Sequence, residues 1–180
     1  MLHRRGSLNE VFSTDQPVVT IARHDVENLK ACVEGSPRKR VRACAHQENT
    51  DGIHEMLIVS ARGTYVRPHK HLDKVESFHV VEGRAAIVLF DEEGGILRVV
   101  ELGDYQSGEC FFYRLNEPLY HSVLIHSEVL VIHETTNGPF NVGDAIFAPW
   151  APDERDMRAA LDYAEQIRAD IGAMAQGMAV

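Results

Sequence analysis

The chain contains 180 residues, of which 27 are acidic and 18 basic, so its formal net charge is −9 at pH 7. This length predicts one compact domain, the acidic excess argues against a general nucleic-acid-binding surface, and no stretch of about 20 apolar residues would cross a membrane. Three cysteines without CxxC spacing predict reduced thiols, and the polar N-terminus does not resemble an export signal. We therefore expect a cytoplasmic protein that binds neither nucleic acid nor membranes.

Residues 1–39 predict an N-terminal arm, a short strand and a short helix. The strand is expected over Val18 to Ala22, and the helix over Asp25 to Val33, with Asp25 as its N-cap. The basic residues that follow, Arg38-Lys39-Arg40 and Arg42, favour a solvated strand edge or turn over a phosphate-binding tract.

Residues 40–150 predict a β domain. Short strand-like runs follow one another at about ten-residue spacing, which favours an all-β sandwich or barrel over alternating strands and helices. These runs are RVRACAH, EMLIVSA, TYVRPH, SFHVVEG, RAAIVLFD, ILRVVEL, CFFYRL, HSVLIH and EVLVIHET. The glycine-containing turn from Asp91 to Gly95 predicts a hairpin between two of them.

Residues 151–180 predict an amphipathic helix and a tail. Apolar residues recur on one helical face between Asp153 and Ile171, and Gly172 supplies a stop signal. Asp153, Glu154 and Asp156 stand in the expected first turn, where the helix dipole favours negative charge. The apolar face predicts packing against the β domain or against a partner subunit, and both remain open.

Two of the ten histidines have the spacing of metal ligands. His69 and His71 lie two residues apart in an extended run, so their side chains project to one face of a strand. Glu76 follows after a step that allows the chain to turn and return its carboxylate to the imidazoles. Two imidazoles and one carboxylate suit a borderline divalent metal and leave positions open. The alternative is a metal-free interior in which these groups satisfy one another, which is costly unless all are hydrogen-bonded.

Five positions with fixed spacing resemble a known motif. Gly63, five residues, His69-Lys70-His71, four residues, Glu76, six residues and Gly83 match the first metal-binding motif of the cupin superfamily. The resemblance implies a mainly β chain: a cupin-type double-stranded β-helix, or jelly-roll barrel, over residues 40–150. A short N-terminal helix and a C-terminal α-helix would flank it.

The second cupin motif carries a fourth ligand, and His121 matches its histidine. That motif reads Gly, five residues, Pro, one residue, Gly, two residues, His, three residues, Asn. The other positions here depart from it: Cys110, Asn116, Pro118 and Ile125. His126 is the next candidate, although its odd offset turns it to the other face. The resemblance implies one divalent ion, Fe, Mn, Ni or Zn, held by His69, His71, Glu76 and His121.

Residues 36–154 are also similar to the WbuC family of cupin-fold metalloproteins. The similarity rests on SPRKRVRACAH, YVRPHKH, LFDEEGGI, EPLYHSV, HETTNGPF and FAPWAPDE. The family occurs in bacterial O-antigen and polysaccharide gene clusters, which implies a small carbohydrate or nucleotide-sugar type substrate. Glu134 matches a glutamate of the family and is a candidate substrate-binding residue. His54-Glu55 stands where the family typically has Gln-Arg.

Three functions fit this ligand set. An isomerase or epimerase in polysaccharide biosynthesis is favoured, and an Fe(II)-dependent dioxygenase or a non-catalytic sensing barrel are the alternatives. Tyr65, His46 and His54 are the candidate catalytic groups for proton transfer, and the two histidines fit equally well as satisfied core residues.

Arg67 is the expected substrate-binding base, because strand alternation places both Tyr65 and Arg67 on the side of His69 unless Pro68 disturbs the count. A guanidinium there would bind a carboxylate or phosphate of an anionic substrate, and a surface ion pair is the alternative. We also expect a homodimer that covers an open sheet edge.

Overall fold

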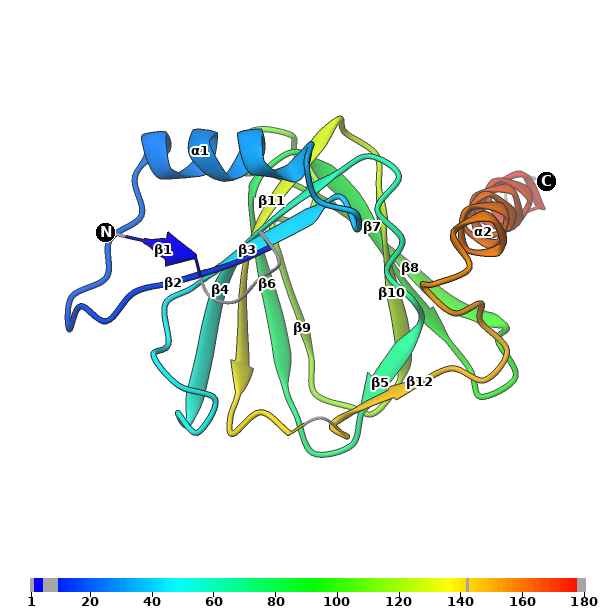
Figure 1. Cartoon of the computed structure of the whole chain (residues 1–180). Helices are drawn as coiled ribbons and strands as arrows, with labels where there is room; N and C mark the ends of the chain where they lie inside the picture. The colour runs from blue at the N-terminus through cyan, green and yellow to red at the C-terminus, as the bar shows by residue number, and fades with distance from the viewer. Residues whose placement is uncertain (1, 5–9, 142, 178–180) are drawn as a thin grey trace.

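Two β-sheets face each other, and a helix lies on the outer side of each (Figure 1). The computed structural model describes residues 2–4, 10–141 and 143–177. The first sheet has the order β1 (His3–Arg4), β2 (Val11–Ser13), β3 (Arg40–Cys44), β4 (Ile53–Ala61), β11 (Val129–Asn137), β6 (Glu76–Glu82) and β9 (Phe112–Leu115). The second has the order β12 (Ala145–Phe147), β5 (His69–His71), β10 (Tyr120–Ile125), β7 (Arg84–Phe90) and β8 (Ile96–Gly103). The helices are α1 (Arg23–Val33) and α2 (Met157–Gly177).

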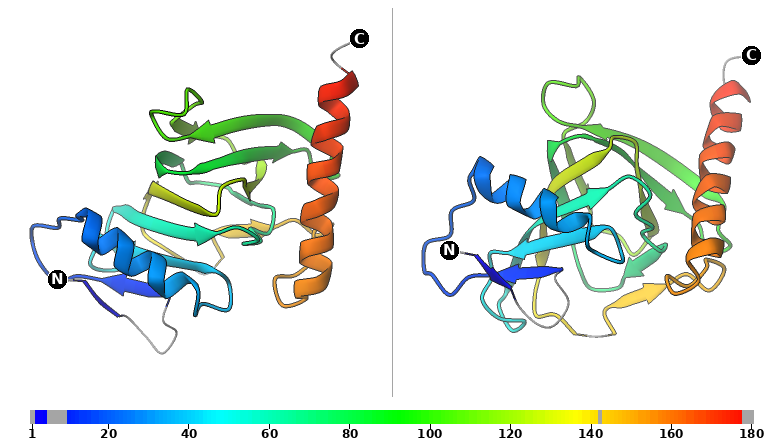
Figure 2. Two further views of the ribbon diagram at one scale, coloured as in Figure 1. Left: turned by 90° about the horizontal axis from the view of Figure 1, so that it is seen from above. Right: turned by 45° about the horizontal axis from the view of Figure 1, so that its top comes forward.

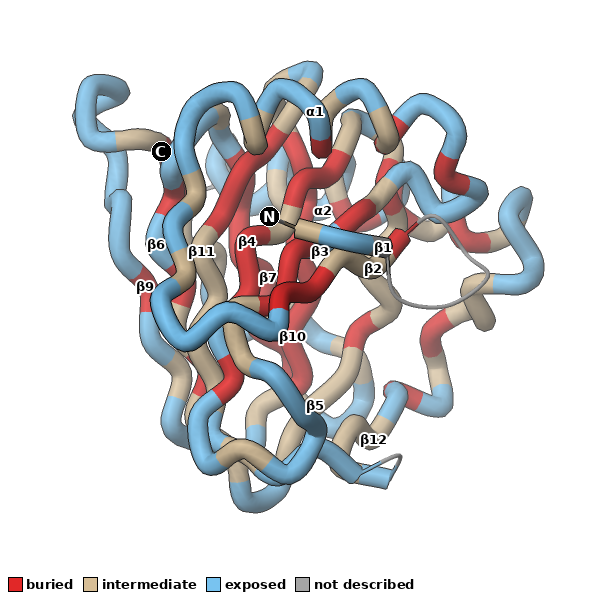
Figure 3. The backbone as a smooth tube through the Cα atoms, turned by 60° about the vertical axis from the view of Figure 1, so that its left-hand side comes forward, coloured by how far each residue is buried: buried red, intermediate tan, exposed pale blue. Residues whose placement is uncertain are grey.

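The main core lies between the sheets, where alternate residues of the central strands point inward. Phe78 and Ile132 contribute to it from the first sheet, and Ile87 and Val123 from the second. Buried backbone follows these central strands, whereas the connecting loops are mostly exposed (Figure 3). The expected mainly β fold is confirmed, and its two facing sheets form a sandwich of the cupin type.

The two helices cover opposite outer faces (Figure 2). Leu29 and Val33 of α1 pack against the outer side of β3 and β4, next to Val41 and Val59. Ala164 and Ile167 of α2 belong to a cluster with residues of β7 and β10. The apolar face of α2 therefore packs on its own chain, which resolves the alternative that the sequence left open.

The N-terminal segment differs from expectation. No strand forms over Val18 to Ala22; instead β2 pairs in parallel with β3, and β1 pairs with β2, where an arm was expected. Helix α1 begins at Arg23, and the Asp25 carboxylate accepts a hydrogen bond from the Ala22 backbone N–H at 2.8 Å. Asp25 therefore stabilises the start of the helix from its third position and is not the N-cap.

The strands predicted between residues 40 and 150 are found, with two differences. The run TYVRPH is irregular up to Pro68, so β5 begins only at His69, and the three-residue β12 was not predicted. The expected hairpin joins β7 to β8, with Gly94 at a φ of 94°.

The C-terminal helix begins and ends later than predicted. Asp156 lies just before it and accepts a hydrogen bond from the Ala159 backbone N–H, so it acts as the cap. Asp153 pairs with Arg155 instead, and the helix continues through Gly172. Across the described residues, neither helix combines the length and apolarity that a bilayer span requires.

Candidate metal centre

The four predicted ligands meet between the sheets. His69 and His71 come from β5, and His121 lies directly opposite His69 on the neighbouring strand β10. Glu76, the first residue of β6, reaches them from the facing sheet. One ligand atom from each residue lies within 4.8 Å of those of the other three. The group can therefore hold one metal ion.

Each imidazole is oriented by a backbone carbonyl. The Nδ1 atoms of His69, His71 and His121 lie 2.9, 3.1 and 3.0 Å from the carbonyl oxygens of Arg67, Asp144 and Leu119. Because a carbonyl only accepts, each Nδ1 carries the hydrogen and donates it, which leaves the lone pair on Nε2. This second hydrogen bond is the usual way in which proteins fix the tautomer of a metal-binding histidine.

Two atoms at the centre have no hydrogen-bond partner among the described residues: Glu76 Oε1 and His121 Nε2. They are buried and lie 3.5 Å apart, while His71 Nε2 lies 3.6 Å from Glu76 Oε2. Two ligands of one ion, with bonds of about 2.0–2.2 Å, lie roughly 3.0–3.5 Å apart at ordinary coordination angles. The donor set and its spacing therefore fit a divalent ion.

The surroundings shift the pKa of the three imidazoles of the centre in different directions. Burial, helped by neighbouring His121, lowers the pKa of His69 to about 4. For His71 and His121 burial also disfavours the charged form, but Glu76 outweighs it and raises the pKa of both. Burial likewise disfavours ionised Glu76, yet the two histidines hold its pKa well below the usual range. An ionised carboxylate thus faces the imidazoles.

Tyr65 and Arg67 do not share the side of His69, because the chain is irregular up to Pro68. The Tyr65 hydroxyl donates to the Pro152 carbonyl at 3.0 Å, and its ring packs against the cluster between the second sheet and α2. Arg67 donates to Asp153 and to the Ala148 carbonyl, each at 3.2 Å. The expectation that strand alternation places Tyr65 and Arg67 beside His69 was therefore wrong, and Tyr65 lies outside the centre.

Arg67 nevertheless remains close to the rim of the centre. Its guanidinium carbon lies 5.1 Å from the ring centroid of Phe147, and that ring is 6.0 Å from the ring of His69. Phe147 was not predicted, because the three-residue strand that carries it has too little pattern to identify. Its aromatic ring is the nearest apolar side chain to His69 among the described ring contacts.

The other candidate residues lie further along the inner face of the first sheet. His54 is opposite Thr136, which is in turn opposite Glu76 on the next strand. Its ring stacks on that of His46 at 4.0 Å, and its Nε2 is buried without a hydrogen-bond partner among the described residues. Glu134 lies two residues from Thr136 on this face and is half-buried.

His126 is not part of the group, because its Nε2 lies 3.1 Å from Glu101. His121, the other histidine considered for the fourth position, is therefore the one that faces Glu76.

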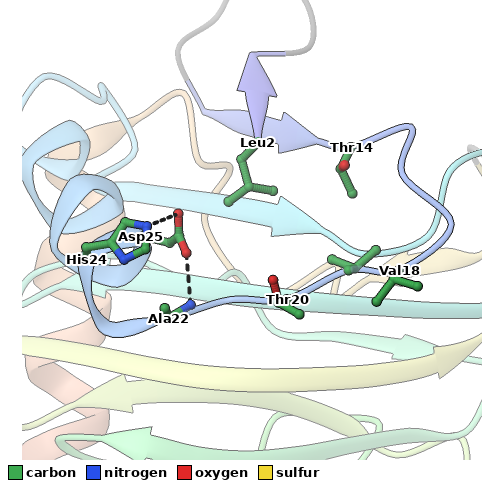
Figure 4. A pocket seen from close by; sticks show the side chains of 8 residues that line it. Leu2, Thr14, Val18, Thr20, Ala22, His24 and Asp25 are labelled. Atoms are coloured by element: carbon green, nitrogen blue, oxygen red, sulfur yellow. Dashed lines mark hydrogen bonds and ion pairs between the residues drawn. The ribbon is translucent and has the colours of Figure 1, made fainter.

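Two pockets of about 280 Å³ each lie away from the inner ligand atoms. The first is formed by the N-terminal segment and α1, and its Asp25 carboxylate is already bound to Ala22 and paired with His24 (Figure 4). The second lies beside the turn after β5, where Lys74 and Asp144 pair at 3.1 Å. These four charged groups are thus paired, and neither pocket replaces the metal centre as the candidate site.

Glu134 makes the metal-free protein sensitive to pH. Burial, together with the charge of Glu76, raises the pKa of Glu134 from 4.5 to about 8. Between these values the native state keeps a proton that the unfolded chain releases, so stability falls as the pH rises. We expect Glu134→Gln to be more stable than the wild type by about 4 kcal/mol at pH 8, and by less than about 1 kcal/mol at pH 5. Urea unfolding at several pH values measures this difference.

Glu128→Gln is the control for this experiment, because the Glu128 side chain is 82% exposed. It should leave the pH dependence of the unfolding free energy unchanged. An equal pH slope in wild type and Glu134→Gln would contradict the raised pKa.

One family model matches part of the chain. It is described as a domain of unknown function (DUF6016) and covers residues 21–102, which include His69, His71 and Glu76 but not His121. No curated protein matches the sequence.

Several solved structures are similar to the chain. They include a variant of Bacillus subtilis oxalate decarboxylase (16% identity, TM-score 0.42), the Schizosaccharomyces pombe Cnp3 cupin domain (11%, 0.43) and a structural-genomics protein of Shewanella oneidensis (14%, 0.48). The matches cover 54%, 55% and 59% of this chain and 24%, 64% and 72% of those chains, respectively. The chain thus spans less than two thirds of the first two. Its own coordinates define a cupin-type fold with a histidine and glutamate group that can hold a metal ion.

Proposed function

We propose that this chain is a metal-dependent cupin that acts on a small carbohydrate or nucleotide-sugar type molecule, as an isomerase or epimerase. The observation that carries the metal site is the convergence of His69, His71, Glu76 and His121 with every Nδ1 engaged by a carbonyl. Three imidazoles and a carboxylate suit Fe, Mn, Ni or Zn. When bound, such an ion polarises a carbonyl or hydroxyl oxygen of the substrate.

Glu134 is the proposed proton-transfer group. It is opposite Phe78 on β6, two residues from Glu76 on the same face, and diagonal neighbours of this kind lie about 7–8 Å apart. That separation leaves room for a substrate atom between Glu134 and the centre. Burial raises the pKa of Glu134, and a carboxyl with a raised pKa suits both giving and taking a proton near neutral pH. An epimerisation or isomerisation needs both transfers.

His54 and Thr136 are proposed to contact substrate hydroxyl groups. Both lie on the inner face in one row with Glu76. The buried, unpartnered Nε2 of His54 and the hydroxyl of Thr136 offer hydrogen bonds to a polyhydroxylated ligand. His54 and its stacked neighbour His46 are the alternative proton-transfer groups to Glu134. Either imidazole could supply the second of the two proton transfers that the reaction needs.

The test combines metal analysis with isotope exchange. Protein purified without chelators is analysed for its metal, then incubated in D₂O with glucose 6-phosphate, fructose 6-phosphate and UDP-glucose. We expect about one ion per chain and deuterium incorporation at a carbon of one probe, seen by NMR, which Glu134→Gln slows by about 100-fold or more.

Other outcomes would overturn parts of the proposal. Oxygen consumption by the iron-loaded protein would replace it with a dioxygenase. Binding of the probes without exchange would make the protein a sensing barrel, and failure to bind any of the four metals would remove the centre.

A further inference from the structure

Basic and apolar residues alternate between the two faces of β3. Val41 and Ala43 are buried on the outer side, in the cluster that includes α1. Arg40 and Arg42 alternate with them and therefore project from the inner face. Arg42 is directly opposite Ile58, which packs against the core between the sheets. The alternation thus directs two arginines toward the space that also contains the metal centre.

Arg40 and Arg42 differ from Arg38 in the hydrogen bonds and ion pairs that their side chains form. Arg38 binds Glu10 at 2.6 Å. Within the described ranges, by contrast, the guanidinium groups of Arg40 and Arg42 form no hydrogen bond and no ion pair. Arg42 is exposed although it belongs to the inner face, so solvent and ligands reach this part of the sandwich.

The surrounding charges are near enough to interact but too far to form pairs. Glu134 acts electrostatically on both arginines, and Glu154 acts on Arg40, yet no ion pair joins them in the described part of the chain. Burial lowers the pKa of Arg40, because its charge is partly removed from water. A partly desolvated guanidinium without a bound carboxylate is stabilised by an anionic ligand.

We propose that Arg40 and Arg42 bind a phosphate group of the ligand whose other end reaches the metal centre. This inference deepens the proposed function, on which it rests. Two guanidinium groups match the charge of a phosphate dianion, and their planar donor forks fit its oxygens.

The distance from Arg42 to the centre is larger than a bare phosphate ion. Counted along the sheet, Arg42 lies three strands and four residues from Glu76, roughly 14 Å by 13 Å. The curvature of the sheet and the lengths of both side chains shorten this path. A bare phosphate does not span such a gap, so the ligand needs a further group that extends from the arginines to the centre.

Calorimetric titration of the metal-loaded and the chelator-treated protein tests the subsite. The probes are UDP-glucose, glucose 6-phosphate and glucose. We expect at least one phosphate-bearing probe to bind the wild type, and Arg42→Gln to weaken that binding by about 10–100-fold. Glucose should be insensitive to the substitution. The two phosphate probes distinguish a nucleotide sugar from a sugar monophosphate.

Arg114→Gln is the matched control, because Arg114 is an exposed strand arginine next to inward-facing Tyr113 and so belongs to the outer face. It should bind the phosphate probes like the wild type. Arg40→Gln should weaken binding as well; if it unfolds, Arg42→Gln still decides the question, since Arg42 is exposed.

The chelator-treated protein separates this proposal from the metal proposal. Arginine-dependent phosphate binding that persists without metal supports the subsite even if no turnover is found. Equal affinity of wild type and Arg42→Gln for both phosphate probes, or no binding of either, overturns it.

Discussion

The His69→Ala, His71→Ala double variant is expected to lose binding of Zn²⁺ and Mn²⁺ while keeping its fold. Both imidazoles contribute an Nε2 lone pair to the centre, and their removal leaves only Glu76 and His121. Loss of a residue that merely orients a metal ligand costs about 10–100-fold in affinity, so loss of two ligands should cost more than 100-fold. Competition with a chromogenic chelator measures the dissociation constants.

His79→Ala is the control for the double variant. His79 lies on β6, three residues after Glu76, and is exposed on the outer face, where its ring contacts Phe111. It should bind metal like the wild type. A free metal concentration of 100 times the dissociation constant should also stabilise the wild type by about 2.7 kcal/mol and leave the double variant unchanged. Tight binding by the double variant would show that the ion is held elsewhere.

Gly83→Ala should be strongly destabilising, because it combines a backbone conformation that favours glycine with a backbone collision. Gly83 joins β6 to β7 with a φ of 92°, a left-handed conformation that costs other residues roughly 1–2 kcal/mol. An added Cβ would also collide with the Val129 carbonyl oxygen and lie 3.2 Å from the Leu130 Cα. Because this contact is with backbone of the neighbouring strand, relief requires a shift of β11, and overpacking adds about 1–3 kcal/mol.

Gly108→Ala separates these two effects. Gly108 has a similar φ of 81°, but an added Cβ would meet nothing within 4 Å among the described residues. It should lose only the conformational part, about 1 kcal/mol, whereas Gly83→Ala should lose about 2–5 kcal/mol in the free energy of urea unfolding. Equal losses in the two variants would exclude the contact with β11 as a cause.

The metal ligands illustrate how much a local pattern can predict. The spacing of His69 and His71 is sufficient to place them on one face, because a strand alternates its side chains with a period of two. Glu76 and His121 come from different strands, and their approach depends on how those strands pair. It was the resemblance to a known motif, more than spacing, that pointed to His121.

Tyr65 and Arg67 show where the same reasoning fails. Alternation requires an extended chain, and the segment before β5 is irregular as far as Pro68. The contacts of Tyr65 with Pro152 and of Arg67 with Asp153 bridge more than eighty residues. No periodicity within a short window contains such a contact.

The sequence by itself determined the mainly β class, most of the strands, the amphipathic C-terminal helix and the spacing of three metal ligands. These features depend on backbone propensity and side-chain alternation, which act over a few residues. Only the tertiary structure decided that α2 packs on its own chain and that Arg40 and Arg42 project from the inner face of the first sheet. Which face of a strand is inner depends on what covers the other face, and α1 covers Val41. That information belongs to the packing of distant segments, so it is absent from any local pattern.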